Sequence, residues 1–165
     1  MSRFLSARPR IPSSPLPRTA LLLLLLALAA ASVSPAAAQD LSLPGLGGGR
    51  LTESDLAQGA TVLVVWASWS PKCRDIVQRV NAIDRRWSGS ARVVTVNFQE
   101  ERSTVQEFLS GQNLAAPVFL DLDGAFSKKN SVTTLPGLLV VRDGATAYRG
   151  RLPDDPDQVI GEILQ

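Results

Sequence analysis

One stretch of the sequence, residues 64–74, joins a buried strand directly to the start of a helix. The continuous apolar run over residues 61–66 is typical of a central strand that is covered on both faces. Ser70 and Pro71 follow, and these residue types favour the N-cap and the first turn of a helix. Cys73, the only cysteine of the chain, comes next. Free backbone N–H groups and the helix dipole favour a thiolate at such a position.

The first 38 residues have the pattern of a secretory signal peptide. Four arginines and no acidic residue precede or flank an apolar run over residues 19–31, and small residues then end in Ala36-Ala37-Ala38. This order predicts cleavage after Ala38. The apolar run is short for a membrane span, which needs about 20 residues, and an uncleaved anchor is the alternative. We therefore expect a periplasmic protein, or one anchored in the inner membrane and facing the periplasm.

The remainder of the chain has the length of one domain. A Leu- and Gly-rich lead-in over residues 39–50, expected as a short edge strand or a linker, precedes a single domain over residues 51–165. After residue 38, the chain has 13 basic and 15 acidic residues, which gives a net charge of −2. This balance gives no support for nucleic-acid binding. Export leads to an oxidising compartment, but one cysteine cannot form an internal disulfide.

Hydrophobic periodicity predicts alternating strands and helices across the domain. Two pairs of residues, Thr52 with Asp55 and Ser103 with Gln106, have the spacing of helix capping boxes. Early crossovers imply parallel strands, and Asp143-Gly144 implies an antiparallel hairpin, so the fold class is α/β with a central mixed sheet flanked by helices. The expected strands cover residues 61–66, 92–98, 117–121, 138–141 and 145–150, and the expected helices cover 71–87, about 103–110, 126–130 and the segment after 155.

The junction and later segments resemble the thioredoxin superfamily. Trp66-Ala-Ser-Trp-Ser-Pro-Lys-Cys-Arg74 is similar to Trp-Ala-Ser/Thr-Trp-Cys-Pro-Pro-Cys-Arg, the active-site signature of exported TlpA/ResA-type thiol-disulfide oxidoreductases. Val132-Thr-Thr-Leu-Pro136 resembles the segment that ends in the cis-proline of that family. The resemblance covers about residues 50–165. It implies a thioredoxin-like fold in which Pro136 is cis and faces Cys73.

Three positions depart from the pattern of that family. Ser70 stands where the family has its attacking cysteine, Lys72 where a second proline is usual, and Val64 where thioredoxins carry a buried acid. Dithiol exchange needs one thiol that attacks a substrate disulfide and a second that resolves the mixed disulfide. With Cys73 alone, the chain cannot cycle between a dithiol and an internal disulfide. If it is an enzyme, it is a monothiol oxidoreductase that acts through Cys73.

Three functions are compatible with these residues. In the first, Cys73 forms mixed disulfides with extracytoplasmic protein or small-molecule thiols. In the second, Cys73 is a shielded apolar residue, and the chain is a non-catalytic module that binds a partner peptide by β-strand addition. In the third, the chain is a monothiol peroxidase, because Ser-x-x-Cys resembles the peroxidatic site of peroxiredoxins, although Trp66 stands where that family has a proline. The candidate catalytic residues are Cys73 and Ser70, and the expected groove residues are Trp69, Pro71, Lys72, Thr134, Leu135 and Pro136.

The sequence gives no sign of a cofactor or a metal. A chain with one cysteine and no histidine lacks the ligand sets of zinc and transition-metal sites. Gly47-Gly48-Gly49 lacks the lysine and the preceding strand of a phosphate-binding loop. Contact with a membrane is expected only if the N-terminal segment is not cleaved.

Overall fold

The computed structural model describes residues 41–165. The predicted signal peptide, residues 1–38, lies outside the described residues. Between residues 41 and 165, no helix has both the length and the apolar character that a membrane crossing requires.

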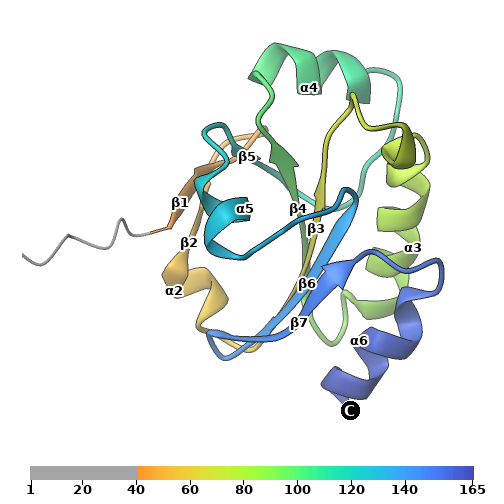
Figure 1. The fold of residues 1–165 in the computed structure, drawn as a ribbon. Helices are drawn as coiled ribbons and strands as arrows, with labels where there is room; N and C mark the ends of the chain where they lie inside the picture. The colour runs from red at the N-terminus through yellow and green to blue at the C-terminus, as the bar shows by residue number, and fades with distance from the viewer. Residues whose placement is uncertain (1–40) are drawn as a thin grey trace, which may run out of the picture. The chain divides into compact units, whose positions relative to one another are not determined.

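The described residues form the helices and strands of an α/β protein, shown in Figure 1. Residues 39–50, expected as an edge strand or a linker, contain the first short strand. In chain order, the elements are β1 (Ser42–Pro44), β2 (Arg50–Thr52), α2 (Glu53–Leu56), β3 (Ala60–Trp66), η1 (Pro71–Cys73), α3 (Ile76–Trp87), β4 (Arg92–Phe98), α4 (Arg102–Leu109), β5 (Val118–Asp121), α5 (Ala125–Lys129), β6 (Gly137–Arg142), β7 (Ala145–Arg151) and α6 (Pro156–Leu164).

A five-stranded mixed sheet with the order β5-β4-β3-β6-β7 forms the centre of the domain. β3 pairs in parallel with β4, and β4 pairs in parallel with β5. β6 pairs antiparallel with both β3 and β7, so the hairpin predicted at Asp143-Gly144 is present. β1 and β2 form a separate antiparallel pair. The predicted fold class, a central mixed sheet flanked by helices, is confirmed.

The sheet separates two apolar clusters, which explains the layers seen in Figure 1. Helices α3 and α6 cover one face, where Trp66 and Cys73 lie with Ile160 of α6. Helices α2 and α5 and the β1-β2 pair cover the other face, where Leu51 and Phe126 pack. Both faces of β3 are therefore covered, and all its side chains from residue 62 onward are fully buried. A continuous apolar run is the expected sequence of such a strand.

The predicted helix over residues 71–87 is not continuous. The segment begins as the short 3₁₀ turn η1, in which the Cys73 N–H donates to the carbonyl oxygen of Ser70 at 2.9 Å. The α-helix α3 starts only at Ile76, with Asp75 at its N-cap. The physical reason lies in the apolar stripe. The apolar stripe of the helix begins at Ile76. Within residues 71–75, only Cys73 is buried. Little packing against the sheet therefore holds this first turn in the α-helical form.

The two predicted capping boxes have different outcomes. Thr52 and Asp55 form a complete box at the start of α2, with each side chain bonded to the backbone of the other. Ser103 does not cap α4, which begins at Arg102 with Glu101 at its N-cap and without a side-chain cap. Arg102 explains the shift, because its guanidinium donates to the carbonyl oxygens of Leu46 and Gly45 and so anchors the start of the helix.

Candidate functional site

The candidate site lies where β3 ends and the chain turns into η1. A tight turn follows the strand, in which the Ser70 N–H donates to the carbonyl oxygen of Ala67 at 3.2 Å. Trp66, at the end of the strand, points into the core and packs against Phe108, with ring centroids 5.3 Å apart. Trp69, within the turn, is 62 % exposed. The turn therefore holds one tryptophan in the core and presents the other to solvent.

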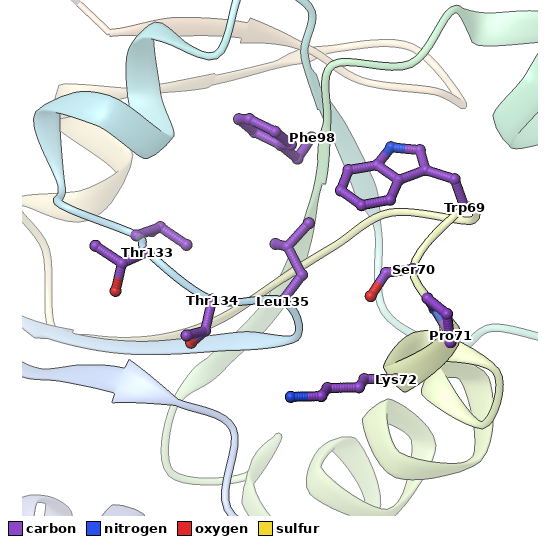
Figure 2. A pocket seen from close by; sticks show the side chains of 9 residues that line it. Trp69, Ser70, Pro71, Lys72, Phe98, Thr133, Thr134 and Leu135 are labelled. Carbon is purple, nitrogen blue, oxygen red and sulfur yellow. The ribbon is translucent and has the colours of Figure 1, made fainter.

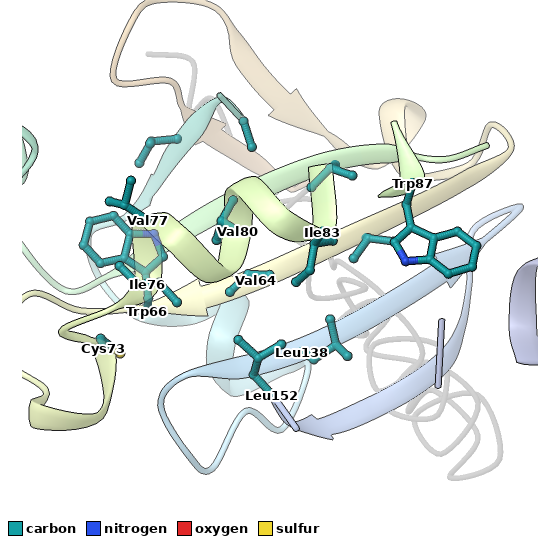
Figure 3. Packing of buried hydrophobic residues seen from close by; sticks show 14 of the residues in the cluster. Val64, Trp66, Cys73, Ile76, Val77, Val80, Ile83, Trp87, Leu138 and Leu152 are labelled. Carbon is teal, nitrogen blue, oxygen red and sulfur yellow. The ribbon is translucent and has the colours of Figure 1, made fainter. Parts of the chain in front are cut away.

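Cys73 lies beneath this turn with its thiol in the apolar core. The residue is fully buried, carries no disulfide, and belongs to the cluster that contains Trp66 and Ile76. Figure 3 shows it at the end of α3 that lies beside Trp66. A substrate therefore cannot reach the sulfur directly in this conformation.

Ser70 occupies the N-cap position of η1 but does not act as a hydrogen-bonding cap, so that part of the prediction is wrong. The first residue of the turn, Pro71, has no N–H to offer. The N–H of Cys73 is already bonded to the carbonyl oxygen of Ser70 itself. Among residues 41–165, the hydroxyl therefore makes no capping bond. Ser70 is only 6 % exposed, and it lines a groove on the surface.

That groove, which we call the apolar groove, has a volume of about 480 Å³. Figure 2 shows Trp69 and Phe98 together on one side of it, the segment of Thr133 to Leu135 on another, and Ser70 between Trp69 and Pro71. Its walls come from segments that are far apart in the sequence. The lining residues are Trp69, Ser70, Pro71, Lys72, Phe98, Val132, Thr133, Thr134 and Leu135.

The Leu135–Pro136 peptide bond is cis, as the resemblance implied. Thr134 and Leu135 precede β6, and within residues 41–165 neither residue takes part in a backbone hydrogen bond. Thr134 is exposed and Leu135 half-buried, so this segment without backbone hydrogen bonds lies at the surface. The carbonyl oxygen of Pro136, by contrast, accepts from the N–H of Leu152 at 2.9 Å.

A second cavity of about 380 Å³, which we call the basic cleft, adjoins the apolar groove. Pro71, Lys72, Thr134 and Leu135 line both cavities. The cleft is otherwise lined by charged residues and by the loop after β7. Its remaining lining residues are Arg74, Asp75, Arg79, Pro136, Arg151, Leu152 and Asp154.

The predicted site residues thus lie either at the two surface cavities or in the apolar core. The tryptophan, serine, proline and lysine of the turn meet Thr134 and Leu135 around the apolar groove. Pro136 lines the basic cleft together with Pro71 and Lys72, so the cis-proline and η1 lie at the same cavity. Cys73, the last residue of η1, lines neither cavity, because its side chain is buried in the core.

Sequence analysis missed Glu100, which joins the ends of β3 and β4. The residue is 8 % exposed, and its Oε2 accepts from the backbone N–H of Ser68 at 2.7 Å and from Nδ2 of Asn97 at 2.7 Å. Its Oε1 accepts from the hydroxyl of Ser68. Glu100 therefore positions the residue that precedes Trp69. The available signal was the pair Asn97 and Glu100, two polar residues at the end of a strand expected to adjoin β3.

Known proteins resemble this chain in sequence and in fold. The chain is 31 % identical over 80 residues to sporulation thiol-disulfide oxidoreductase A of Bacillus subtilis, a match that covers 46 % of this chain and 48 % of that protein. The chain spans about half the length of the curated relatives it matches.

Two solved structures share the fold. A putative thiol:disulfide interchange protein DsbE from Chlorobium tepidum superposes with a TM-score of 0.66 at 26 % identity, over 77 % of this chain and 92 % of that one. The exposed lipoprotein thioredoxin Etrx1 from Streptococcus pneumoniae superposes with a TM-score of 0.66 at 18 % identity, over 75 % of this chain and 97 % of that one. The fold is thus thioredoxin-like, as the resemblance implied.

The model of one protein family matches residues 35–149, from before β1 into β7. This range contains the turn of Ser70 and Cys73, the buried Glu100 and the cis-proline segment, which together build the site. Since it spans more than half of a chain with a thioredoxin-like fold, we conclude that the chain belongs to the AhpC/TSA family.

Proposed function

We propose that the chain is an exported thioredoxin-like protein that acts in extracytoplasmic thiol-disulfide redox handling. Its site, Ser70-x-x-Cys73, holds one sulfur and cannot run dithiol exchange alone. The observation that carries this proposal is the shared groove. The turn that holds Ser70 and covers Cys73 lines the same groove as Thr134 and Leu135, the residues before the cis-proline.

The proposed location rests on the N-terminal segment and on one relative. Residues 1–38 have the basic, apolar and Ala-x-Ala pattern of a signal peptide. The pneumococcal relative is described as an exposed lipoprotein. We therefore propose a periplasmic location after cleavage at Ala38, with an uncleaved inner-membrane anchor as the alternative.

The redox step that one thiol supports is an exchange with a disulfide supplied by a partner. The thiolate of Cys73 attacks one sulfur of that disulfide, which forms a mixed disulfide and releases the other sulfur as a thiolate. A thiol from a second molecule then attacks the partner sulfur of the mixed disulfide. Cys73 leaves as a thiolate, and the disulfide now joins the partner to the second molecule. Because Cys73 is fully buried, the turn over it must move before the first attack.

The groove supplies the binding part of this function. An extended partner segment can pair its backbone with the open N–H and C=O groups of Thr134 and Leu135, which is the β-strand addition mode of recognition. Its side chains would then contact the exposed ring of Trp69 and the ring of Phe98 across the groove. Exposed aromatic rings of this kind commonly anchor partners.

A second candidate function is a binding module without catalysis. The observation that favours it is the complete burial of Cys73 among apolar side chains. In this case the cysteine packs as a small apolar residue, and the groove binds a partner without forming a covalent bond.

Alkylation of Cys73 separates the two functions. A small maleimide is added to the native protein and to the same protein in urea, across a range of pH, and the labelled fraction is measured by mass spectrometry. The redox proposal predicts labelling of the native protein within minutes at neutral pH. The binding-module proposal predicts labelling only after unfolding.

Thiol trapping in cells provides the second test. Adducts are captured by acid quenching and alkylation, with the Cys73→Ala variant as the control. The redox proposal predicts a disulfide-linked partner that is lost in Cys73→Ala, whereas a binding module gives no disulfide-linked partner in either protein. The third hypothesis, a monothiol peroxidase, predicts rapid consumption of hydrogen peroxide with a small thiol as reductant. This activity should be lost in Ser70→Ala.

A further inference from the structure

The apolar groove and the basic cleft adjoin each other and share part of their lining. Thr134 and Leu135 line both cavities, as do Pro71 and Lys72 from η1. Any extended segment that pairs with the backbone of Thr134 and Leu135 therefore lies over the boundary between the two. One side of that boundary offers the rings of Trp69 and Phe98, and the other offers charged side chains.

Positive charge is concentrated in the basic cleft. Four cations line it, Lys72, Arg74, Arg79 and Arg151, against two carboxylates. This excess contrasts with the chain after residue 38, whose net charge is −2. Lys72, Arg74 and Arg151 are exposed. The two ion pairs within residues 41–165, Arg92 with Asp55 and Lys129 with Glu53, involve none of the cleft residues.

The wall of the basic cleft is held in place by hydrogen bonds. The guanidinium of Arg79, on α3, donates to the carbonyl oxygens of Leu152 and Pro153 at 3.3 and 2.7 Å. The N–H of Leu152 donates to the carbonyl oxygen of Pro136. These bonds tie the loop after β7 to both α3 and the cis-proline segment. The charged groups of the cleft therefore project from a fixed frame beside the groove.

We propose that the basic cleft selects the partner segment by charge. The segment is an extended polypeptide that places an apolar side chain in the apolar groove and an adjacent acidic side chain in the basic cleft. Successive side chains of an extended strand point to opposite sides, so a segment bound at Thr134 and Leu135 can direct neighbouring side chains to the two cavities that these residues line. A carboxylate in the cleft would meet Arg74 and Arg151, which form charge-assisted hydrogen bonds with such groups. This inference rests on the partner groove proposed above.

Trp69 provides the signal for a binding experiment. The chain has three tryptophans, of which Trp66 and Trp87 are buried and Trp69 is 62 % exposed. A ligand in the apolar groove should therefore change the emission of Trp69 alone. The probes are three blocked peptides without cysteine, Gly-Ser-Leu-Glu-Leu-Glu-Ser-Gly and its versions with glutamine or lysine in place of both glutamates. Since they hold no sulfur, they report binding separately from exchange.

We expect the glutamate peptide to bind about fivefold more tightly than the glutamine peptide at low salt, a ratio typical of two exposed ion pairs. The lysine peptide should bind most weakly, and added salt should reduce the difference. The double variant Arg74→Glu and Arg151→Glu should lose the preference, because both arginines line the cleft and not the apolar groove. The matched control, Arg85→Glu with Arg149→Glu, makes the same change of charge at exposed positions outside both cavities and should keep it.

The inference would be overturned by equal affinity for the three peptides or by tighter binding of the lysine peptide. It would also be overturned if the variant with Arg74→Glu and Arg151→Glu kept the preference for the glutamate peptide. The same holds if no peptide changes the emission of Trp69. None of these outcomes decides the proposed redox function, because a partner trapped through Cys73 would still support that function. If only the trapped adduct is absent, the proposed redox function is contradicted, and the inferred preference for acidic peptides is not.

Discussion

Replacing Glu100 by alanine removes the carboxylate that connects the ends of β3 and β4 next to the candidate site. The carboxylate accepts three hydrogen bonds, two from Ser68 and one from Nδ2 of Asn97. Asn97 is fully buried, and its Oδ1 is without a hydrogen-bond partner among the described residues. Glu100→Ala would therefore leave the whole amide of Asn97 unpaired in the core, whereas the half-buried Ser68 can turn to water.

The expected cost follows from these contacts. A buried polar group that loses its partner costs about 1–3 kcal/mol, and a hydrogen bond to a charged group contributes about 1.5–3 kcal/mol. We therefore expect Glu100→Ala to lower the free energy of unfolding by about 2–4 kcal/mol. Glu100→Gln is the matched control. Its amide oxygen can accept from Asn97 and from the N–H of Ser68, while its amide nitrogen donates to the Ser68 hydroxyl, so the loss should be only about 1 kcal/mol.

Urea unfolding of both variants, followed by far-UV circular dichroism, measures the two losses. Quenching of Trp69 by iodide provides a local readout, because Ser68 precedes Trp69 in the turn. Glu100→Ala should change this quenching in the native state, and Glu100→Gln should leave it unchanged. Equal losses in the two variants would refute the reasoning, since they would show that the hydrogen bonds retained by glutamine do not hold the turn.

Three further predictions concern stability. Asp55→Ala breaks the capping box with Thr52 and should cost about 1 kcal/mol in thermal or urea unfolding, while an unchanged midpoint would show that the box contributes nothing. The bond from Lys129 lowers the pKa of Glu53, and the bond from Thr52 lowers the pKa of Asp55, so both carboxylates stabilise the native state above the unfolded pKa of about 4. Stability should therefore fall as the pH drops below about 4.5, and less steeply in Asp55→Ala; the same slope in both proteins would contradict this. Cys73→Ser puts a hydroxyl into the apolar cluster and should cost about 1–3 kcal/mol, more than Cys73→Ala, and the reverse order of urea midpoints would show that the site is not apolar.

Much of the fold could be predicted because its signals are local. The apolar run of β3 has no polar residue from 62 onward, since both faces of the strand are covered. Asp143-Gly144 marks the β6-β7 hairpin by its own turn chemistry. The resemblance of the segment that ends at Pro136 was enough to predict the cis bond.

The features that could not be predicted depend on contacts between distant residues. Ser68 and Glu100 are 32 positions apart, and nothing near either residue indicates that they pair. The capping prediction at Ser103 failed because Arg102 bonds to carbonyl groups more than 50 residues away. Whether the sulfur of Cys73 would be open or covered depended on packing against the sheet, where Cys73 joins the cluster that contains Trp66 and Ile76.

The central proposal, a thioredoxin-like site that is limited by the absence of a second sulfur, is tested most directly by the Ser70→Cys variant. The variant is oxidised, its free thiols are counted, and its reduction of insulin disulfides is measured with dithiothreitol as the electron source. We expect both thiols to disappear into one intramolecular disulfide, and insulin reduction well above that of the unmodified chain and of Ser70→Cys combined with Cys73→Ala. A folded variant whose two thiols stay free and which reduces no insulin would contradict the proposal.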